Sequence, residues 1–389
     1  MRFQSFLHLS CAVLACACAS PFGLALAQGT SAQTVSSGTS SVWIDPIGAP
    51  AEAMPLAAQS LLLGVVRSGE HYVAVGARGD VLLSDDGRAW RQVPVPTRMT
   101  FTAVAGVDAQ LWAVGHEGVI AHSADGGEHW ELQRQDPWKA PTADDNAALD
   151  SHQGVPLLGV LFTDIHRGYA VGAYSLALKT IDGGATWQSL TVATKSKPGA
   201  EAANAEVDAP KGKHSDAQTF TQDELKLGQE ATPHLNAIAR TGSGALFIVG
   251  ERGSAFRSRD DGASWQRLQL PYDGSMFGVI GYEADHVLTF GLRGHVYEST
   301  DLGEHWTQLP TGTELSLMGG VAMPGGGSAI VGANGMVLVR AHAGEALQSY
   351  VDESAGIIAA VMPFSDNGTL LIAGENGVSL FDIGKSQPK

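Results

Sequence analysis

The chain has 389 residues, of which 44% are hydrophobic and 16% are charged, and this composition excludes a wholly disordered protein because it supplies enough apolar surface for a full core. Its 24 lysines and arginines against 40 acidic residues give a formal charge of −16, which argues against nucleic acid and anionic lipid surfaces as partners. All three cysteines lie within the first 18 residues, so beyond that point thiol catalysis and cysteine-bound metals are excluded.

The first 27 residues have the pattern of an export signal. Arg2 precedes an apolar run over residues 3–20, and Ala25-Leu26-Ala27 supplies the small residues that a signal peptidase recognises. We expect cleavage directly after this tripeptide, a periplasmic location, and a flexible segment over residues 28–40. Two alternatives remain open: a retained anchor, for which the interrupted run is short, and a lipoprotein attached at Cys16, before which almost no hydrophobic region stands.

A strand-like motif recurs seven times along the rest of the chain. Each copy is an apolar run that ends in glycine, and these glycines are 39, 57, 78, 41, 41 and 42 residues apart. A period of about 40 residues built from short β-rich runs is typical of four-stranded propeller blades. The two long intervals indicate insertions within the array. The repeat glycines are Gly76, Gly115, Gly172, Gly250, Gly291, Gly332 and Gly374.

We therefore predict an all-β fold, a seven-bladed β-propeller of four-stranded antiparallel blades over residues 41–384, followed by a short tail at 385–389. The insertions are placed at 136–154 and 193–218, and the second has no aromatic residue, which predicts disorder. The seventh copy lacks a fourth strand. The apolar segment 41–47 is expected to supply it and to close the ring, which would remove an exposed sheet edge.

Five copies continue into a second motif, Ser/Thr-x-Asp-x-Gly-x-x-Trp, which is the Asp-box. It reads as a hairpin in which Asp accepts hydrogen bonds from turn amides, Gly takes positive φ, and Trp packs between neighbouring sheets. We interpret the box as structural rather than catalytic. Its residues are Asp85 and Trp90, Asp125 and Trp130, Asp182 and Trp187, Asp260 and Trp265, and Asp301 and Trp306.

The turns between second and third strands direct the search for function. In this strand order they lie on the same face as the connections between blades, whereas the boxes lie on the opposite face. Three of these turns carry arginine in one equivalent position, at Arg78, Arg252 and Arg293. Together they predict a cationic patch for a carboxylate or an acidic peptide, although a solvated turn arginine is the alternative. Tyr174 occupies the third turn and is a further candidate contact.

No catalytic or metal-binding motif accompanies these features. The sequence contains no His-Glu-x-x-His, no Gly-x-Ser-x-Gly and no phosphate-binding Gly-x-x-x-x-Gly-Lys. His129 and His305 share the box position that Thr186 and Ser264 hold in sister blades, which favours turn capping. We therefore expect no catalytic residue, no metal site and no cofactor.

The Val-Gly-x-x-Gly strands, the Asp-x-Gly-x-x-Trp turns and the blade count resemble the photosystem II stability and assembly factor family over residues 61–382. The resemblance implies a non-enzymatic propeller that binds a membrane-protein subunit through an arginine-bearing face, to which Arg78, Arg252 and Arg293 would correspond. Some relatives in non-photosynthetic bacteria are associated with export systems of the resistance-nodulation-division (RND) type, so the resemblance also implies such a system as a partner.

The sequence therefore predicts a non-enzymatic periplasmic scaffold or assembly factor for an envelope or membrane protein. Two alternatives also use propellers with Asp-boxes or aromatic faces. A sialidase-like glycosidase would need an arginine triad and a Tyr-Glu pair on six blades, and the Arg-Ile-Pro signature usual in that class does not occur. A glycan-binding lectin would stack sugars on aromatic side chains such as Tyr174.

Overall fold

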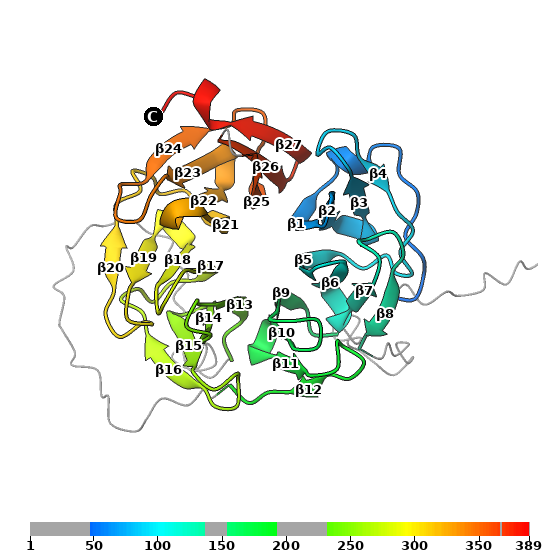
Figure 1. The fold of residues 1–389 in the computed structure, drawn as a ribbon, viewed down its shortest axis with the longest axis horizontal. Coiled ribbons are helices and arrows are strands. Elements are labelled where there is room, and N and C mark those ends of the chain that lie inside the picture. The colour runs from blue at the N-terminus through cyan, green and yellow to red at the C-terminus, as the bar shows by residue number, and fades with distance from the viewer. Residues whose placement is uncertain (1–46, 137–153, 193–231, 366–367, 389) are drawn as a thin grey trace, which may run out of the picture. The chain divides into compact units, whose positions relative to one another are not determined.

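The computed structural model describes residues 47–136, 154–192, 232–365 and 368–388 (Figure 1). These residues form seven antiparallel sheets, six with four strands and one with three. The innermost strands of consecutive sheets contact one another around a ring, and the last of them, β25 (Ile358–Ser365), contacts the first, β1 (Leu62–Ser68). The predicted seven-bladed β-propeller is confirmed.

Each blade is an antiparallel meander whose strands follow one another in chain order from the centre outward (Figure 1). Blades one to three comprise β1 (Leu62–Ser68), β2 (His71–Gly76), β3 (Val81–Ser84), β4 (Arg91–Gln92); β5 (Phe101–Val107), β6 (Gln110–Gly115), β7 (Ile120–Ser123), β8 (Glu131–Arg134); β9 (Leu157–Phe162), β10 (Gly168–Gly172), β11 (Ala177–Thr180) and β12 (Gln188–Ser189).

Blades four to seven comprise β13 (Leu235–Arg240), β14 (Leu246–Gly250), β15 (Ser254–Ser258), β16 (Gln266–Gln269); β17 (Met276–Gly281), β18 (Val287–Gly291), β19 (Val296–Ser299), β20 (Thr307–Leu309); β21 (Leu317–Met323), β22 (Gly327–Gly332), β23 (Met336–Arg340), β24 (Gln348–Val351); β25 (Ile358–Ser365), β26 (Thr369–Gly374) and β27 (Gly377–Asp382). Short 3-10 turns connect them: η1 (Ala57–Gln59), η2 (Ala77–Gly79), η3 (His116–Gly118), η4 (Ala173–Ser175), η5 (Leu292–Gly294), η6 (Pro324–Gly326), η7 (Ala333–Gly335) and η8 (Ile383–Lys385).

The repeat glycine ends the second strand of every blade because nothing larger fits there. A β-carbon on Gly115 would overlap the backbone oxygen of Thr100, and one on Gly374 would overlap that of Ile357. Those same oxygens accept hydrogen bonds from the residue after the glycine, His116 in the first case, at 3.0 Å. The glycine thus lets the second strand approach the start of the first, which sets the repeat that the sequence displays.

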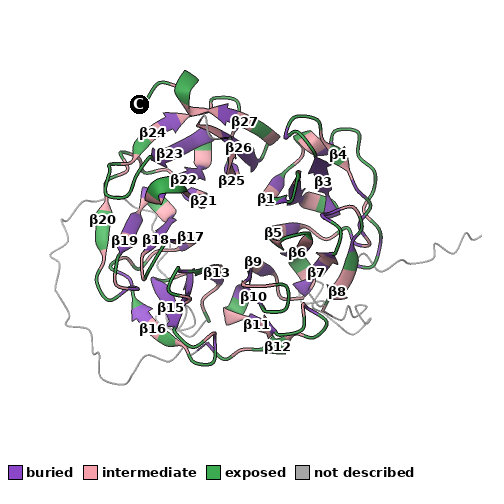
Figure 2. Cartoon of the chain, in the orientation of Figure 1, coloured by how far each residue is buried: buried purple, intermediate pink, exposed green. Residues whose placement is uncertain are grey.

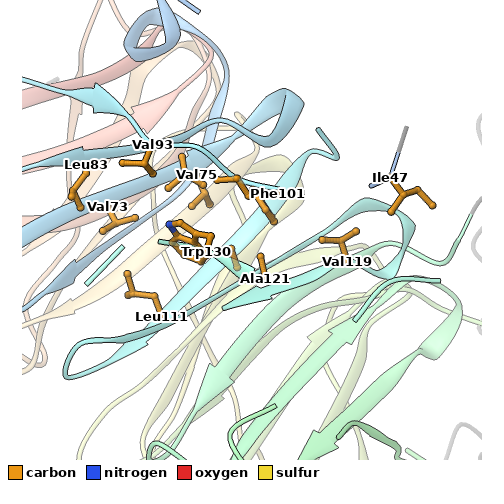
Figure 3. Close-up of a cluster of buried hydrophobic side chains, with 13 residues drawn as sticks. Ile47, Val73, Val75, Leu83, Val93, Phe101, Leu111, Val119, Ala121 and Trp130 are labelled. Atoms are coloured by element: carbon orange, nitrogen blue, oxygen red, sulfur yellow. The ribbon is translucent and has the colours of Figure 1, made fainter. Parts of the chain in front are cut away.

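The core is distributed among the seams between neighbouring blades rather than gathered at one centre. The second strands, and the third strands of blades one to six, are buried along almost their whole length (Figure 2). Figure 3 shows the seam between blades one and two, where side chains from both sheets interdigitate around the ring of Trp130. Its buried members include Val73, Val75, Leu83, Phe101, Leu111 and Ala121.

Segment 41–47 was expected to supply the fourth strand of blade seven, and Ile47 is its one described residue. Ile47 is buried with Val93 and Val119 in the seam between blades one and two (Figure 3), so it does not lie beside blade seven. Burial of its side chain among the apolar residues of that seam accounts for its position. Among the described residues, β27 is hydrogen-bonded to β26 alone in its sheet. The turn η1 contacts β27, and the Ala58 backbone lies beside Gly377, where β27 begins.

Several expectations fall outside the described residues. These are the signal segment 1–27, the segment 28–46, and the insertions apart from Asp136 and Gly154, which bound the first. The described part of the chain contains no helix long and apolar enough to cross a membrane.

Candidate functional site

One end of the ring, which we call the box face, carries the first-to-second and third-to-fourth strand turns. In blade three, Thr180 donates its hydroxyl to Asp182 at 2.7 Å and accepts the N–H of Gly184 at 2.9 Å. Asp182 also accepts the hydroxyl of Thr186 at 2.6 Å and its N–H at 2.9 Å, and these two bonds lower the pKa of Asp182 to about 2. Three other carboxylates close their turns in the same way: Asp125, Asp260 and Asp301.

In blade one the box aspartate is Asp86, and the assignment of Asp85 from the sequence is wrong. Asp86 accepts the N–H groups of Arg88 at 2.8 Å and Ala89 at 2.7 Å, and the hydroxyl of Ser84 at 3.2 Å. Asp85 instead pairs with His71 and is 83% exposed. Adjacent aspartates made the register ambiguous, whereas Ser84, two residues before Asp86, marks the correct one.

The box turns also bind neighbouring blades to each other. In three blades the carbonyl after the box aspartate accepts side-chain donors from the preceding blade. Trp112 donates its ring N–H to the Gly183 carbonyl at 3.0 Å, and Tyr169 donates its hydroxyl to the Asp261 carbonyl at 2.8 Å. Burial and the hydrogen bond to Asp261 raise the pKa of Tyr169 well above its usual range. Arg257 donates to the Leu302 carbonyl at 2.9 Å. The polar groups of the box face are therefore used within the ring.

The five box tryptophans lie at these seams. Trp130 is 8% exposed and donates its ring N–H to the Gly127 carbonyl at 2.9 Å. The other four are half-buried and pack against the core clusters of adjacent blades: Trp90, Trp187, Trp265 and Trp306.

Blade six breaks the box rule. Arg340 stands where sister blades have Ser or Thr, is fully buried, and donates to Glu298 of blade five at 2.6 Å. His286 pairs with the same carboxylate at 2.8 Å, and these partners hold the pKa of Glu298 below its usual range. A cavity of about 760 Å³ opens beside this cluster, lined in part by Tyr282, His286 and Met323. The sequence predictions did not include this cluster: aligning Arg340 with the box serines marks its unusual position, but no local pattern points to its partner Glu298 in blade five.

The opposite end of the ring, which we call the turn face, carries the second-to-third strand turns. Arg78 has φ 55° and the following Gly79 has φ 75°, and Arg293 has the same conformation. Two consecutive positive φ values suit the twist of a hairpin, and Asn-Gly is the usual sequence for them, as Asn334-Gly335 in blade six shows. The first of the two positions directs its side chain to solvent: Arg78 is 58% exposed and Tyr174 is 64% exposed.

The four predicted contact residues do not form one continuous patch. Tyr174, Arg252 and Arg293 occupy the equivalent turns of blades three, four and five, which are consecutive, and all three are exposed. Arg78 stands apart in blade one, because Glu117 holds the same position in blade two between them. The basic character is therefore concentrated on blades four and five.

Aromatic side chains and the described ends of both insertions lie next to these turns. Tyr174 packs edge-on against His234, with ring centroids 5.0 Å apart. The N–H of Asp136 donates to Glu117 at 2.9 Å, and that of Ser175 donates to Pro233 at 2.9 Å. Asp136, at the start of the first insertion, and Pro233, which follows the second in the described part of the chain, therefore lie at the turn face.

The fold of this chain is similar to that of YCF48. A structure described as YCF48 bound to D1 peptide matches with a TM-score of 0.57 at 18% identity, covering 87% of this chain and 97% of that one. YCF48 from Cyanidioschyzon merolae matches with a TM-score of 0.57 at 15% identity, covering 87% and 99%. The resemblance to photosystem II assembly factors that the sequence indicated thus holds for the fold.

A second neighbour is PorZ of Porphyromonas gingivalis, described as an essential bacterial surface component of the type-IX secretion system. It matches with a TM-score of 0.54 at 15% identity, covering 88% of this chain and 39% of PorZ. Such identities establish a shared fold. No family model and no curated protein matches the sequence. Within the residues that the structure describes, no group of three or more His, Cys, Asp or Glu side chains is arranged to hold a metal ion.

Proposed function

We propose that this protein is a non-enzymatic periplasmic scaffold that binds an acidic, extended segment of an envelope or membrane protein on its turn face. The observation that carries the proposal is the presence of exposed arginine at the left-handed position of adjacent blades, Arg252 and Arg293. Positive φ costs a non-glycine residue free energy, and asparagine meets the same requirement in blade six. Because the turn itself does not require arginine, recognition is the better reason for it.

The electrostatics of the chain support an acidic ligand. On a protein of net charge −16, two neighbouring guanidinium groups form a local site for carboxylates, which arginine binds bidentately. Tyr174 and His234 supply an aromatic surface on the adjoining blade. The neighbour described as YCF48 bound to D1 peptide supports a peptide as the class of ligand.

The periplasmic location rests on the export pattern of residues 1–27. The surface location in the description of PorZ supports an envelope role for this fold. An export system of the RND type is one partner to examine within this proposal.

The test is capture of partners from solubilised membranes with the chain carrying Arg252→Glu and Arg293→Glu. We expect at least about a tenfold loss of the specifically captured protein, because two charge-assisted contacts become repulsive. Arg240→Glu, at an exposed position at the box-face end of β13, is the matched control and should leave capture unchanged. Equal capture by the unchanged chain, the double variant and the Arg240→Glu control would refute a role for the turn face.

A further inference from the structure

Blade seven has three strands among the described residues, so β27 lies at the edge of its sheet there. In the six other blades a fourth strand covers the third, whereas β27 (Gly377–Asp382) has a sheet partner only on its inner side among the described residues. An uncovered edge strand presents a row of unpaired N–H and C=O groups and is a template for another strand.

The fourth strands of the other blades show what such a strand contributes. Beyond the tryptophan, the fourth-strand segments of blades three, four and five send apolar side chains into the seam with the following blade, as Leu268 and Leu270 do between blades four and five. In the part of the chain that the structure describes, no fourth strand contributes to the seam between blades seven and one. Its buried members are small or come from blade one and η1: Ala57, Leu62, Ala74, Leu82 and Ala373.

Exposed apolar side chains accumulate beside this seam. Leu56 and Met54 adjoin η1, which contacts β27, and Leu61 and Ile357 adjoin the neighbouring strands β1 and β25. Their exposed fractions are 65%, 38%, 40% and 41% respectively. We call these four residues the seam patch. They are four of the seven large hydrophobic residues exposed in the described part of the chain.

We propose that the outer edge of β27 binds an extended segment of a partner protein, with apolar residues at alternate positions, as an added fourth strand. The added strand runs antiparallel to β27, as fourth strands do in the sister blades, and so reaches the seam patch where it arrives at the turn face. The repeat defines the form of the ligand, because the third strand of each of the six other blades pairs with an extended fourth strand. This contact is separate from the arginine-bearing turns and does not depend on them.

The test uses hydrogen exchange on the full chain with a synthetic peptide of sequence 264–272, the fourth-strand region of blade four. We expect this peptide to slow the exchange of the amides of residues 377–382. The same peptide with proline in place of Leu268 should not slow it, because proline has no N–H to donate to the neighbouring strand. Leu56→Asp should weaken binding of the unsubstituted peptide about tenfold, since the peptide can no longer bury the Leu56 side chain. Ile181→Asp, at 64% exposed, is the matched control and should not change it.

Three results would overturn the proposal. One is unchanged exchange of residues 377–382 at saturating peptide. Another is exchange that slows with protein concentration alone, which would assign the edge to a second copy of the chain. The third is faster exchange of β27 in a full chain with Val42, Trp43 and Ile44 changed to Ser, which would assign the edge to the chain's own N-terminal segment.

Discussion

The two faces of the ring use their turns in opposite ways. On the box face, aspartates such as Asp182 and Asp260 bind their own turn amides, and the neighbouring carbonyls accept donors from the preceding blade. On the turn face, Tyr174 and Arg293 direct exposed side chains away from backbone positions that suit asparagine or glycine. The comparison teaches that the recurrent motif holds the ring together, whereas the positions that vary between blades, to which we assign recognition in our proposal, present side chains to solvent.

The largest expected effect lies on the box face at blade six. Arg340→Leu should destabilise the protein by about 3–5 kcal/mol, because it leaves Glu298 without its buried partner. Urea unfolding measures the change. The double variant Arg340→Leu with Glu298→Gln removes both charges and should recover most of the loss. A loss under about 1 kcal/mol for the single variant would mean that this seam is not held by the pair.

The box tryptophans differ in burial, and the loss of stability on replacing them should follow that difference. Trp130→Ala should cost about 3–4 kcal/mol because the ring is nearly enclosed, and Trp265→Ala about 2 kcal/mol because it is half-buried. Thermal and urea unfolding would measure both. Equal losses would show that the seams of blades two and four are packed alike despite the difference in exposure.

The first blade offers an internal control for the box assignment. Asp86→Ala should lower the free energy of unfolding, because the turn amides of Arg88 and Ala89 lose their acceptor, whereas Asp85→Ala should leave it almost unchanged because its pair with His71 is exposed. The reverse order in an unfolding experiment would restore Asp85 as the box residue.

These cases show how far the sequence predicts the structure. The seven repeat glycines fixed the number of blades because each meets a steric limit inside one blade, such as Gly115 against Thr100. Box turns were recognisable for the same reason, since Thr180 and Asp182 act within a few residues of each other.

Features that arise between blades were beyond the sequence. Arg340 meets Glu298 across a separation of 42 residues, and Ile47 packs against Val119, so neither contact has a local pattern. On the turn face the equivalent positions were visible in the sequence. Which of these positions are neighbours follows from the order of the blades around the ring, in which Glu117 of blade two separates Arg78 from Arg252 and Arg293.

The box carboxylates also predict how stability depends on pH. The folded pKa of Asp182 and of Asp260 is about 2 against an ordinary value of 3.8, so stability is retained above pH 3.8 and is lost as the pH falls towards 2. Asp301 raises the pKa of His305 above 6.5, so that contribution is present below pH 6.5 and is lost as the pH rises through the raised value. Thermal unfolding across pH 2–9 measures both, and His305→Ser should remove only the second.

The smallest expected change in stability tests most directly whether the turn face serves binding rather than folding. Arg293→Asn copies the Asn334-Gly335 turn of blade six and should raise stability by about 0.5–1 kcal/mol, because asparagine tolerates positive φ better than arginine. The same variant should weaken partner capture. Arg240→Asn, an exposed position without positive φ, should change neither quantity. A loss of stability in Arg293→Asn would show that the arginine serves the fold, and the distinction between a face that holds the ring and a face that recognises a partner would fail.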